Sequence, residues 1–218
     1  MRISFIKEEV PFGADYERLC GVSLNPLRHV AANAHEHCEL VRERVVELAG
    51  LNGCGEAETA LLADLARVHD IGKLSGTSRP EEAVALLSRY GVTDEQLINL
   101  VKYHDINLAW HIAARRGEPP GDKAWRKLAS RLDLRLLCIF MVADRVDCPG
   151  GWRRNEALVW FLGEVERRRL LPTPLVLNDG PVLATAPSEV EEVSAGCVLV
   201  HDGDGGGAAS LAPQPETR

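Results

Sequence analysis

Four polar residues of this 218-residue chain stand within otherwise apolar helical patterns, and their types are those that bind metal ions. They are His37, His69, His104 and Asp144. Residues three or four apart share one face of a helix, so each of these side chains is expected to point with its apolar neighbours toward the interior. Buried polar groups without partners are costly. A metal ion bound by imidazole nitrogens and carboxylate oxygens would satisfy all four together.

His69 and Asp70 are adjacent at the end of the predicted helix 56–70. One helix end therefore offers both a nitrogen and an oxygen ligand. Gly72 follows closely, and we expect it to end this helix, because glycine is the residue that most often terminates helices.

Each residue also has an ordinary structural interpretation. An isolated histidine on an apolar face is more often a hydrogen-bonded core residue than a ligand. Asp144 on its own could pair with Arg145 or Arg135. These alternatives stay open for each residue taken alone. They become less favoured when the four residues are considered together, because all four occur in one predicted helical domain.

Three segments resemble the motifs of the HD superfamily of metal-dependent phosphohydrolases. EHCELVRERVVELA is similar to the helix of the first histidine, ADLARVHDIGKL to the signature, and VADRVD to the segment of the final aspartate. The similarity covers roughly residues 33–150. It implies an all-α fold and a divalent metal ion (Mn, Fe, Co, Ni, Zn or Mg). The ligands that it implies are His37, His69, Asp70 and Asp144.

His35 competes with His37 for the place of the first ligand. Residues two apart on a helix point about 160° away from each other, so only one of them can face the metal. His37 shares a stripe with Val41 and Val45, whereas His35 does not. We therefore favour His37, and we interpret His29 as structural or exposed.

Catalytic and substrate-binding roles follow from the metal. A bound divalent ion lowers the pKa of water toward about 7 and supplies hydroxide near neutral pH. Asp70 is expected to ligate and to help orient that water. Lys73 is a candidate to neutralise the substrate phosphate, or else a solvated cation at a helix end; Arg145 is a weaker candidate, and Arg115 and Arg116 fit surface charge better.

His104 lies in LVKYHD, which resembles the region where some HD enzymes carry further histidines for a second metal or for phosphate. Asp105 occupies the position where several relatives have a second histidine. We therefore predict one metal per chain, with His104 as a catalytic residue that contacts the substrate. His111 fits packing or surface, and a di-iron oxygenase of the same superfamily would need both His104 and His111 to point inward.

Composition limits the remaining possibilities. The formal net charge of −7 argues against a protein that binds long nucleic acid through its overall field. The start MRISFIKEEVPF lacks the apolar region of a signal peptide, and the longest apolar run, residues 136–143, is too short to cross a bilayer. The six cysteines form no C-x-x-C pair. We predict reduced thiols, no membrane association and a cytoplasmic location.

The patterns predict an all-α HD-domain helical bundle with a short irregular or β-like C-terminal tail. The predicted divisions are an irregular lead-in (1–28), an HD-type helical domain (29–170), a C-terminal extension (171–201) and a disordered tail (202–218). Predicted helices include 29–49, 56–70, 123–147 and 154–170, and residues 105–116 are expected to be helical. Short strands are possible at 176–183 and 196–200.

The resemblance implies a phosphohydrolase that cleaves a phosphate ester of a small molecule. TPLVLNDGPVL is faintly similar to the segment after the HD domain of bacterial tRNA nucleotidyltransferases, which favours a nucleotide or a nucleic-acid end as substrate. The alternative from another class is a non-catalytic HD module that senses a ligand. Oligomeric state stays open.

Overall fold

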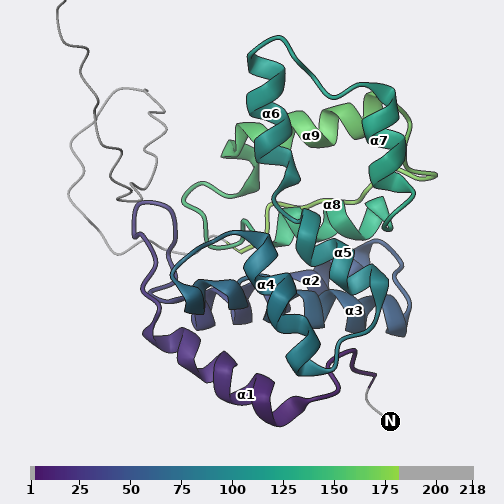
Figure 1. Cartoon of the computed structure of the whole chain (residues 1–218). Coiled ribbons are helices and arrows are strands. Elements are labelled where there is room, and N and C mark those ends of the chain that lie inside the picture. Colours follow the sequence, from purple (N-terminus) through teal and green to yellow (C-terminus); the bar gives the residue numbers. More distant parts are fainter. Residues whose placement is uncertain (1–2, 182–218) are drawn as a thin grey trace, which may run out of the picture. The chain divides into compact units, whose positions relative to one another are not determined.

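A computed structural model describes residues 3–181, and this part of the chain is helical (Figure 1). Its helices are α1 (Glu9–Arg18), α2 (Ala34–Leu51), α3 (Glu56–Val68), α4 (Pro80–Leu87), α5 (Glu95–Tyr103), α6 (Ile106–Arg115), α7 (Asp122–Ala129), α8 (Leu134–Ala143) and α9 (Glu156–Arg167). No β-strand occurs in these residues, where Ser23 and Asn33 form an isolated antiparallel bridge. The predicted all-α fold is confirmed.

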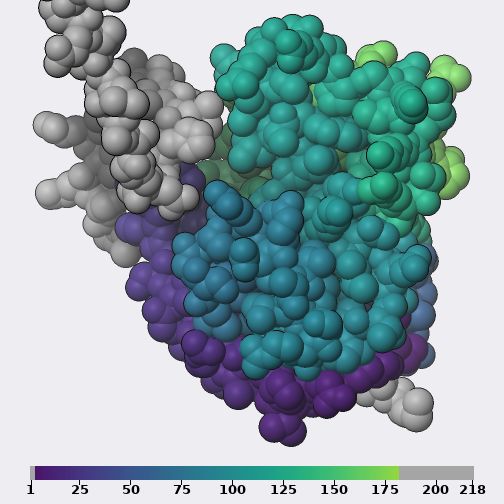
Figure 2. Space-filling model, in the orientation of Figure 1, coloured from purple at the N-terminus to yellow at the C-terminus, as the bar shows by residue number. Residues whose placement is uncertain are grey.

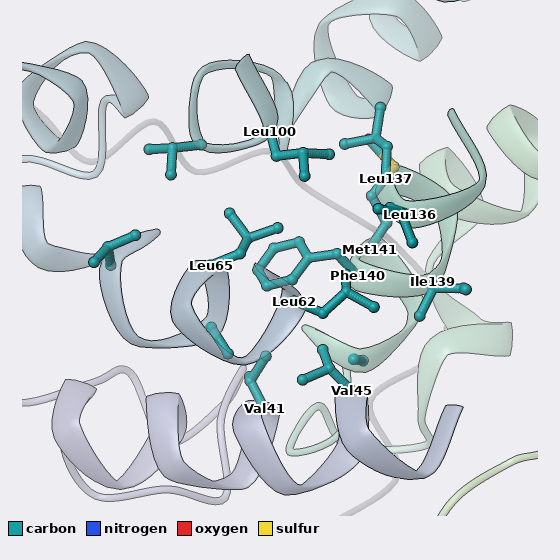
Figure 3. Packing of buried hydrophobic residues seen from close by; sticks show 14 of the residues in the cluster. Val41, Val45, Leu62, Leu65, Leu100, Leu136, Leu137, Ile139, Phe140 and Met141 are labelled. Carbon is teal, nitrogen blue, oxygen red and sulfur yellow. The ribbon is translucent and has the colours of Figure 1, made fainter. Parts of the chain in front are cut away.

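The core surrounds α8, which contacts α2, α3 and α9 (Figure 1). This helix has the sequence LRLLCIFMVA, and all its residues except Arg135 are buried. A helix that is apolar all round is stable only when it is covered on every side. Figure 3 shows Val41 and Val45 of α2 and Leu100 of α5 near Phe140 of α8.

The predicted single helix 123–147 is wrong, because the chain forms two helices there, α7 and α8. Asp133 begins α8 as its N-cap, and its side chain accepts hydrogen bonds from the backbone N–H groups of Arg135 and Leu136 at 2.8 and 3.2 Å. Aspartate prefers this position because it satisfies N–H groups that have no partner inside the helix. As a result α8 ends at Ala143, and Asp144 stands at the helix end rather than inside a helix.

The lead-in 1–28 was predicted to be irregular, yet Glu9–Arg18 forms α1. Pro11 lies in the first turn of this helix, where a missing N–H removes no hydrogen bond. Phe12 and Tyr16 are buried in the common core, which explains why a segment of modest helical pattern becomes ordered. Figure 2 shows the purple N-terminal segment bordering the blue surface around α4. The next helix begins at Ala34, five residues later than predicted from His29.

Gly72 does not end α3. The helix stops at Val68, a 3₁₀ turn runs from Ile71 to Ser75, and Gly76 has the left-handed φ of 77° that terminates it. Gly72 is buried against α4, and a β-carbon there would lie 2.7 Å from the backbone nitrogen of Ala83. Glycine is therefore required for close packing between this turn and α4.

Residues 171–181 have no regular structure, so no strand forms at 176–181. Side chains nevertheless anchor this segment. Arg44 and Trp152 donate to the carbonyl of Asn178 at 2.8 and 3.0 Å. Asn52 and Val176 exchange two hydrogen bonds of 2.9 and 3.0 Å. The predictions for 196–200 and for the disordered tail 202–218 lie outside the described residues.

Within residues 3–181, no helix combines the length and the apolar character that a membrane span requires. The five cysteines of this part of the chain all carry free thiols.

Candidate metal centre

Three helices end at the predicted site residues. His69, His104 and Asp144 each directly follow the last residue of α3, α5 and α8. The carbonyl groups at a helix C-terminus carry partial negative charge, which favours a cation nearby. His37 comes from the first turn of α2, and its ring centroid lies 5.4 Å from that of His69. The ends of three helices and the start of a fourth therefore bring these imidazoles and carboxylates together.

The donor atoms of His37, His69, Asp70 and Asp144 lie close together. Nε2 of His37 and Nε2 of His69 are 3.4 Å apart, and they lie 3.1 and 3.2 Å from Oδ1 of Asp144. Oδ2 of Asp70 lies 3.4 Å from Nε2 of His69 and 3.7 Å from Nε2 of His37. Atoms bound to one ion at about 2.1 Å are about 3.0–3.4 Å from their neighbours in octahedral or tetrahedral geometry. His37, His69 and Asp144 are thus brought together at distances that suit one ion, and Asp70 lies next to the two imidazoles.

The outer ring nitrogens show which atoms are available to that ion. Nδ1 of His69 lies 2.9 Å from the carbonyl oxygen of Ala66, and Nδ1 of His37 lies 3.1 Å from Oδ1 of Asp147. The carbonyl oxygen of Ala66 only accepts hydrogen bonds, so Nδ1 carries the proton in a neutral His69 ring, and the nearby carboxylate of Asp147 favours the same tautomer for His37. Both Nε2 lone pairs then face the Oδ1 atom of Asp144, an arrangement that requires a proton or a metal ion between them.

Burial and neighbouring charges shift the pKa values of these groups in opposite directions. Burial lowers the pKa of His37, but Asp144 and Asp147 outweigh it and raise that pKa to about 10. Burial likewise lowers the pKa of His69, and Asp70 and Asp144 raise it to about 9. Burial raises the pKa of Asp70, yet His69 and neighbouring cations hold it well below its usual range. Without metal the imidazoles therefore carry protons that a bound ion must displace.

The two predicted phosphate-binding cations lie at the edge of this cluster. Nζ of Lys73 is 2.6 Å from Oδ2 of Asp70. Arg145 bridges two carboxylates, with Nη1 at 3.2 Å from Oδ2 of Asp144 and Nη2 at 3.1 Å from Oδ1 of Asp105. The side chains of Lys73 and Arg145 are 18% and 19% exposed, more than those of the ligands that they contact. They are therefore partly exposed side chains at the edge of the cluster.

His104 lies beside the four donors. Its ring centroid is 5.4 Å from that of His69, and its side chain is buried. Nδ1 lies 2.7 Å from the carbonyl oxygen of Val101, and Nε2 lies 3.4 Å from Oδ2 of Asp105. Burial lowers the pKa of His104, but Asp105 outweighs it, so the net change is upward. This side chain is placed to carry a proton next to the predicted metal.

Two other histidines lie elsewhere. His35 is half-buried and packs on Tyr16, with ring centroids 4.6 Å apart. His37 is the histidine of this pair that faces the cluster, in agreement with its apolar stripe. His111 packs on Trp160 of α9, with ring centroids 5.7 Å apart, as expected for a packing residue.

Asp147 is a site residue that reasoning from the sequence missed. Its side chain is fully buried and contacts both His37 and His29. The segment VADRVD contained the signal, because Asp147 follows Asp144 by three residues, the spacing of one helical face.

No model of a known protein family matches this sequence, and no curated protein or solved structure is similar to it. What the cluster can bind therefore follows from its own side chains. His37, His69 and Asp70 form a buried group that could hold a metal ion. Two imidazoles with carboxylates fit Mn, Fe, Co, Ni or Zn, whereas Mg prefers oxygen ligands alone.

Proposed function

We propose that this chain is a metal-dependent phosphohydrolase of the HD type that cleaves a phosphate ester of a small molecule, with a nucleotide as the favoured substrate class. One observation carries the proposal: Nε2 of His37, Nε2 of His69 and Oδ1 of Asp144 lie within 3.1–3.4 Å of one another, with Asp70 alongside. A divalent ion bound there would lower the pKa of a water molecule and polarise a phosphoryl oxygen.

Charge balance supports a single ion. The cluster and its edge hold four carboxylates against two fixed cations. The carboxylates are those of Asp70, Asp105, Asp144 and Asp147, and the cations are Lys73 and Arg145. Uncompensated buried charge is costly, and a divalent ion bound to neutral His37 and His69 would offset this excess of negative charge.

The residues around the proposed ion would have different roles. Asp144 offers Oδ1 to the ion while Arg145 holds its Oδ2, so the carboxylate has one orientation. Asp70 is anchored by Lys73 and is the carboxylate placed to orient a water molecule. Lys73 and Arg145 are partly exposed at the edge of the cluster, where their charges would attract and neutralise a phosphate group.

His104 is suited to general acid catalysis. Its Nδ1 is fixed on the carbonyl oxygen of Val101, so Nε2 is the atom that exchanges a proton. Asp105 favours the protonated ring, and a leaving alkoxide that reached Nε2 would receive that proton. Because its two ring nitrogens contact Val101 and Asp105, His104 is not counted among the metal ligands. This agrees with the prediction of one metal per chain.

The other classes make different demands on the same residues. A di-iron oxygenase needs His104 and His111 both to point inward, but His111 packs on Trp160. A sensing module would bind its ligand without turning it over. The complete ligand set of His37, His69, Asp70 and Asp144 favours catalysis over sensing.

The test is a metal-by-substrate screen on purified full-length protein. Chelated protein would receive Mn²⁺, Co²⁺, Ni²⁺, Zn²⁺ or Mg²⁺ and then nucleotides, p-nitrophenyl phosphate and bis-p-nitrophenyl phosphate. We expect chelation to abolish turnover and a transition metal to restore it, while His69→Ala prepared in the same way stays inactive. Ligand binding without turnover under every metal would favour the sensing module instead.

A further inference from the structure

Behind the proposed metal ligands lies a second layer of buried polar contacts. We propose that Asp147, braced by His29, is a positioning residue that holds the ring of His37 with Nε2 directed at the metal. This inference rests on the proposed metal centre, and it does not depend on which reaction the centre performs. Neither residue belongs to the four predicted ligands.

The contacts form a chain of three side chains. Nδ1 of His37 lies 3.1 Å from Oδ1 of Asp147, and Nδ1 of His29 lies 3.0 Å from Oδ2 of the same carboxylate. The rings of His29 and His37 are 5.1 Å apart at an angle of 76°. Asp147 therefore stands between two imidazoles, with one oxygen directed at each.

Asp147 acts on the far side of His37 from the metal. The two nitrogens of an imidazole point away from each other, so a group at Nδ1 cannot share the ion bound at Nε2. Nδ1 of His37 makes no well-aligned hydrogen bond within the described residues, and Asp147 is the group that lies against it. Carboxylates in this position orient a ligating ring and increase its basicity.

The carboxylate itself is held firmly. Its side chain is 0% exposed, and each of its two oxygens lies against an imidazole nitrogen. A backbone hydrogen bond also holds Asp147 in place: the N–H of Val30 donates to the carbonyl oxygen of Asp147 at 2.8 Å. The segment before α2 is thus fastened to the turn after α8.

A competing role for Asp147 is as a ligand of a second ion. His29, Asp147 and Cys148 place potential ligand atoms within 4.8 Å of one another. Both oxygens of Asp147 already face imidazole nitrogens, which favours the positioning role. A second-ion site predicts a second metal equivalent that is lost in Cys148→Ser. The positioning role predicts that Cys148→Ser holds as much metal as the wild type.

The experiment measures Co²⁺ affinity of the full chain by competition with a chelating indicator. Asp147→Asn keeps the shape of the side chain and removes its charge, and we expect affinity to fall about 10–100-fold. His29→Gln should weaken affinity less. The double variant should be no weaker than Asp147→Asn, because His29 acts through Asp147.

Asp64→Asn is the matched control. Asp64 is also a buried carboxylate, and it accepts a 2.7 Å hydrogen bond from the N–H of Phe5, away from the cluster. Its substitution should lower thermal stability and leave Co²⁺ affinity unchanged. Circular dichroism establishes that each variant is folded, and His29→Gln tests the proposal if Asp147→Asn does not fold.

Three results would overturn the positioning role. They are wild-type affinity in folded Asp147→Asn or His29→Gln, loss of a second metal equivalent in Cys148→Ser, and no divalent ion bound by the wild type. The last result would overturn the metal centre as well. Absence of phosphoester turnover with normal metal binding would instead refute the proposed reaction and leave the role of Asp147 standing.

Discussion

Oδ1 of Asp144 lies 3.1 Å from Nε2 of His37, although 107 positions separate the two residues in the chain. This contact joins the end of α8 to the start of α2. A carboxylate oxygen and the lone pair of a neutral imidazole do not attract each other, so this contact requires either a proton on Nε2 or a metal ion bound to both atoms. The predictions below follow from that relationship and from the residues around it.

Asp70→Ala should lose metal and activity while the helices stay folded. Asp70 is expected to supply an anionic ligand at a helix end, and its carboxylate contacts His69 and Lys73, so its removal takes away polar contacts rather than apolar packing. Metal affinity should fall by more than about 100-fold, because about 100-fold is the upper limit for losing a residue that only hydrogen-bonds to a ligand. Metal analysis and circular dichroism check this together. A folded variant with wild-type metal content would remove Asp70 from the site.

His35→Ala and His37→Ala form a matched pair on one helix. His37 faces the cluster and His35 packs on Tyr16, so only His37→Ala should lose metal. Equilibrium dialysis of both proteins against Mn²⁺ measures the difference. The opposite outcome, with metal kept in His37→Ala and lost in His35→Ala, would show that the first ligand was assigned to the wrong residue.

His104→Ala should keep its metal and lose catalytic rate by about 10²-fold, the lower range for a general acid. The reason is that Nε2 contacts Asp105 rather than the ligand group. Turnover of a small phosphoester and metal content are to be measured on the same preparation. Two metal equivalents in the wild type that fall to one in the variant would make His104 a ligand of a second metal.

Metal affinity should rise with pH. The pKa of His37 is raised to about 10 and that of His69 to about 9, above the ordinary value of 6.5. Their protons stabilise the metal-free protein below about pH 6.5, and this stability is lost as pH rises through about 9–10. Binding releases the same protons, so affinity should increase by up to about tenfold per pH unit per proton.

Titration of chelated protein with Co²⁺ from pH 6.5 to 9, with thermal unfolding at each pH, measures both trends. The metal-free protein should become less stable over the range in which metal binds more tightly. Affinity that does not change with pH would contradict the account of His37 and His69.

Gly72→Ala should destabilise the protein by about 1–3 kcal/mol, because the new β-carbon would lie 2.7 Å from the backbone of Ala83. Gly163→Ala is the control, since no atom lies within 4 Å of a β-carbon there. In the middle of α9 this change should stabilise by about 0.5–1 kcal/mol. Urea denaturation compares the two, and equal stability of both variants would contradict the packing of the 3₁₀ turn on α4.

The all-α fold was predictable because apolar residues recur at helical spacing, and the same stripes indicated that His37, His69 and Asp144 are buried. The helix boundaries were harder to predict than the fold class. The predicted helix 123–147 missed the break before Asp133, since a capping aspartate inside a polar run looks like one more exposed helical residue. Glu9–Arg18 was missed because its order comes from burial of Phe12 and Tyr16, a tertiary effect that the local pattern does not contain.

The supporting residues of the site were harder to predict than the ligands. Asp147 contacts His29 across 118 positions of sequence, and no local spacing links the two residues. Arg145 was interpreted as a substrate-binding cation, and the structure adds that it bridges Asp144 and Asp105. Such contacts depend on how α2, α5 and α8 meet, which is decided by packing rather than by any single segment.

The most direct test is the amount of divalent metal per chain in the wild type and in Asp144→Asn, measured by mass spectrometry after reconstitution and removal of free ion. Asp144→Asn keeps the side-chain shape and removes the charge that faces both Nε2 atoms. The account predicts one equivalent in the wild type and less than about a tenth of that in the variant, with both proteins folded. No metal in the wild type, or equal amounts in both proteins, would contradict it.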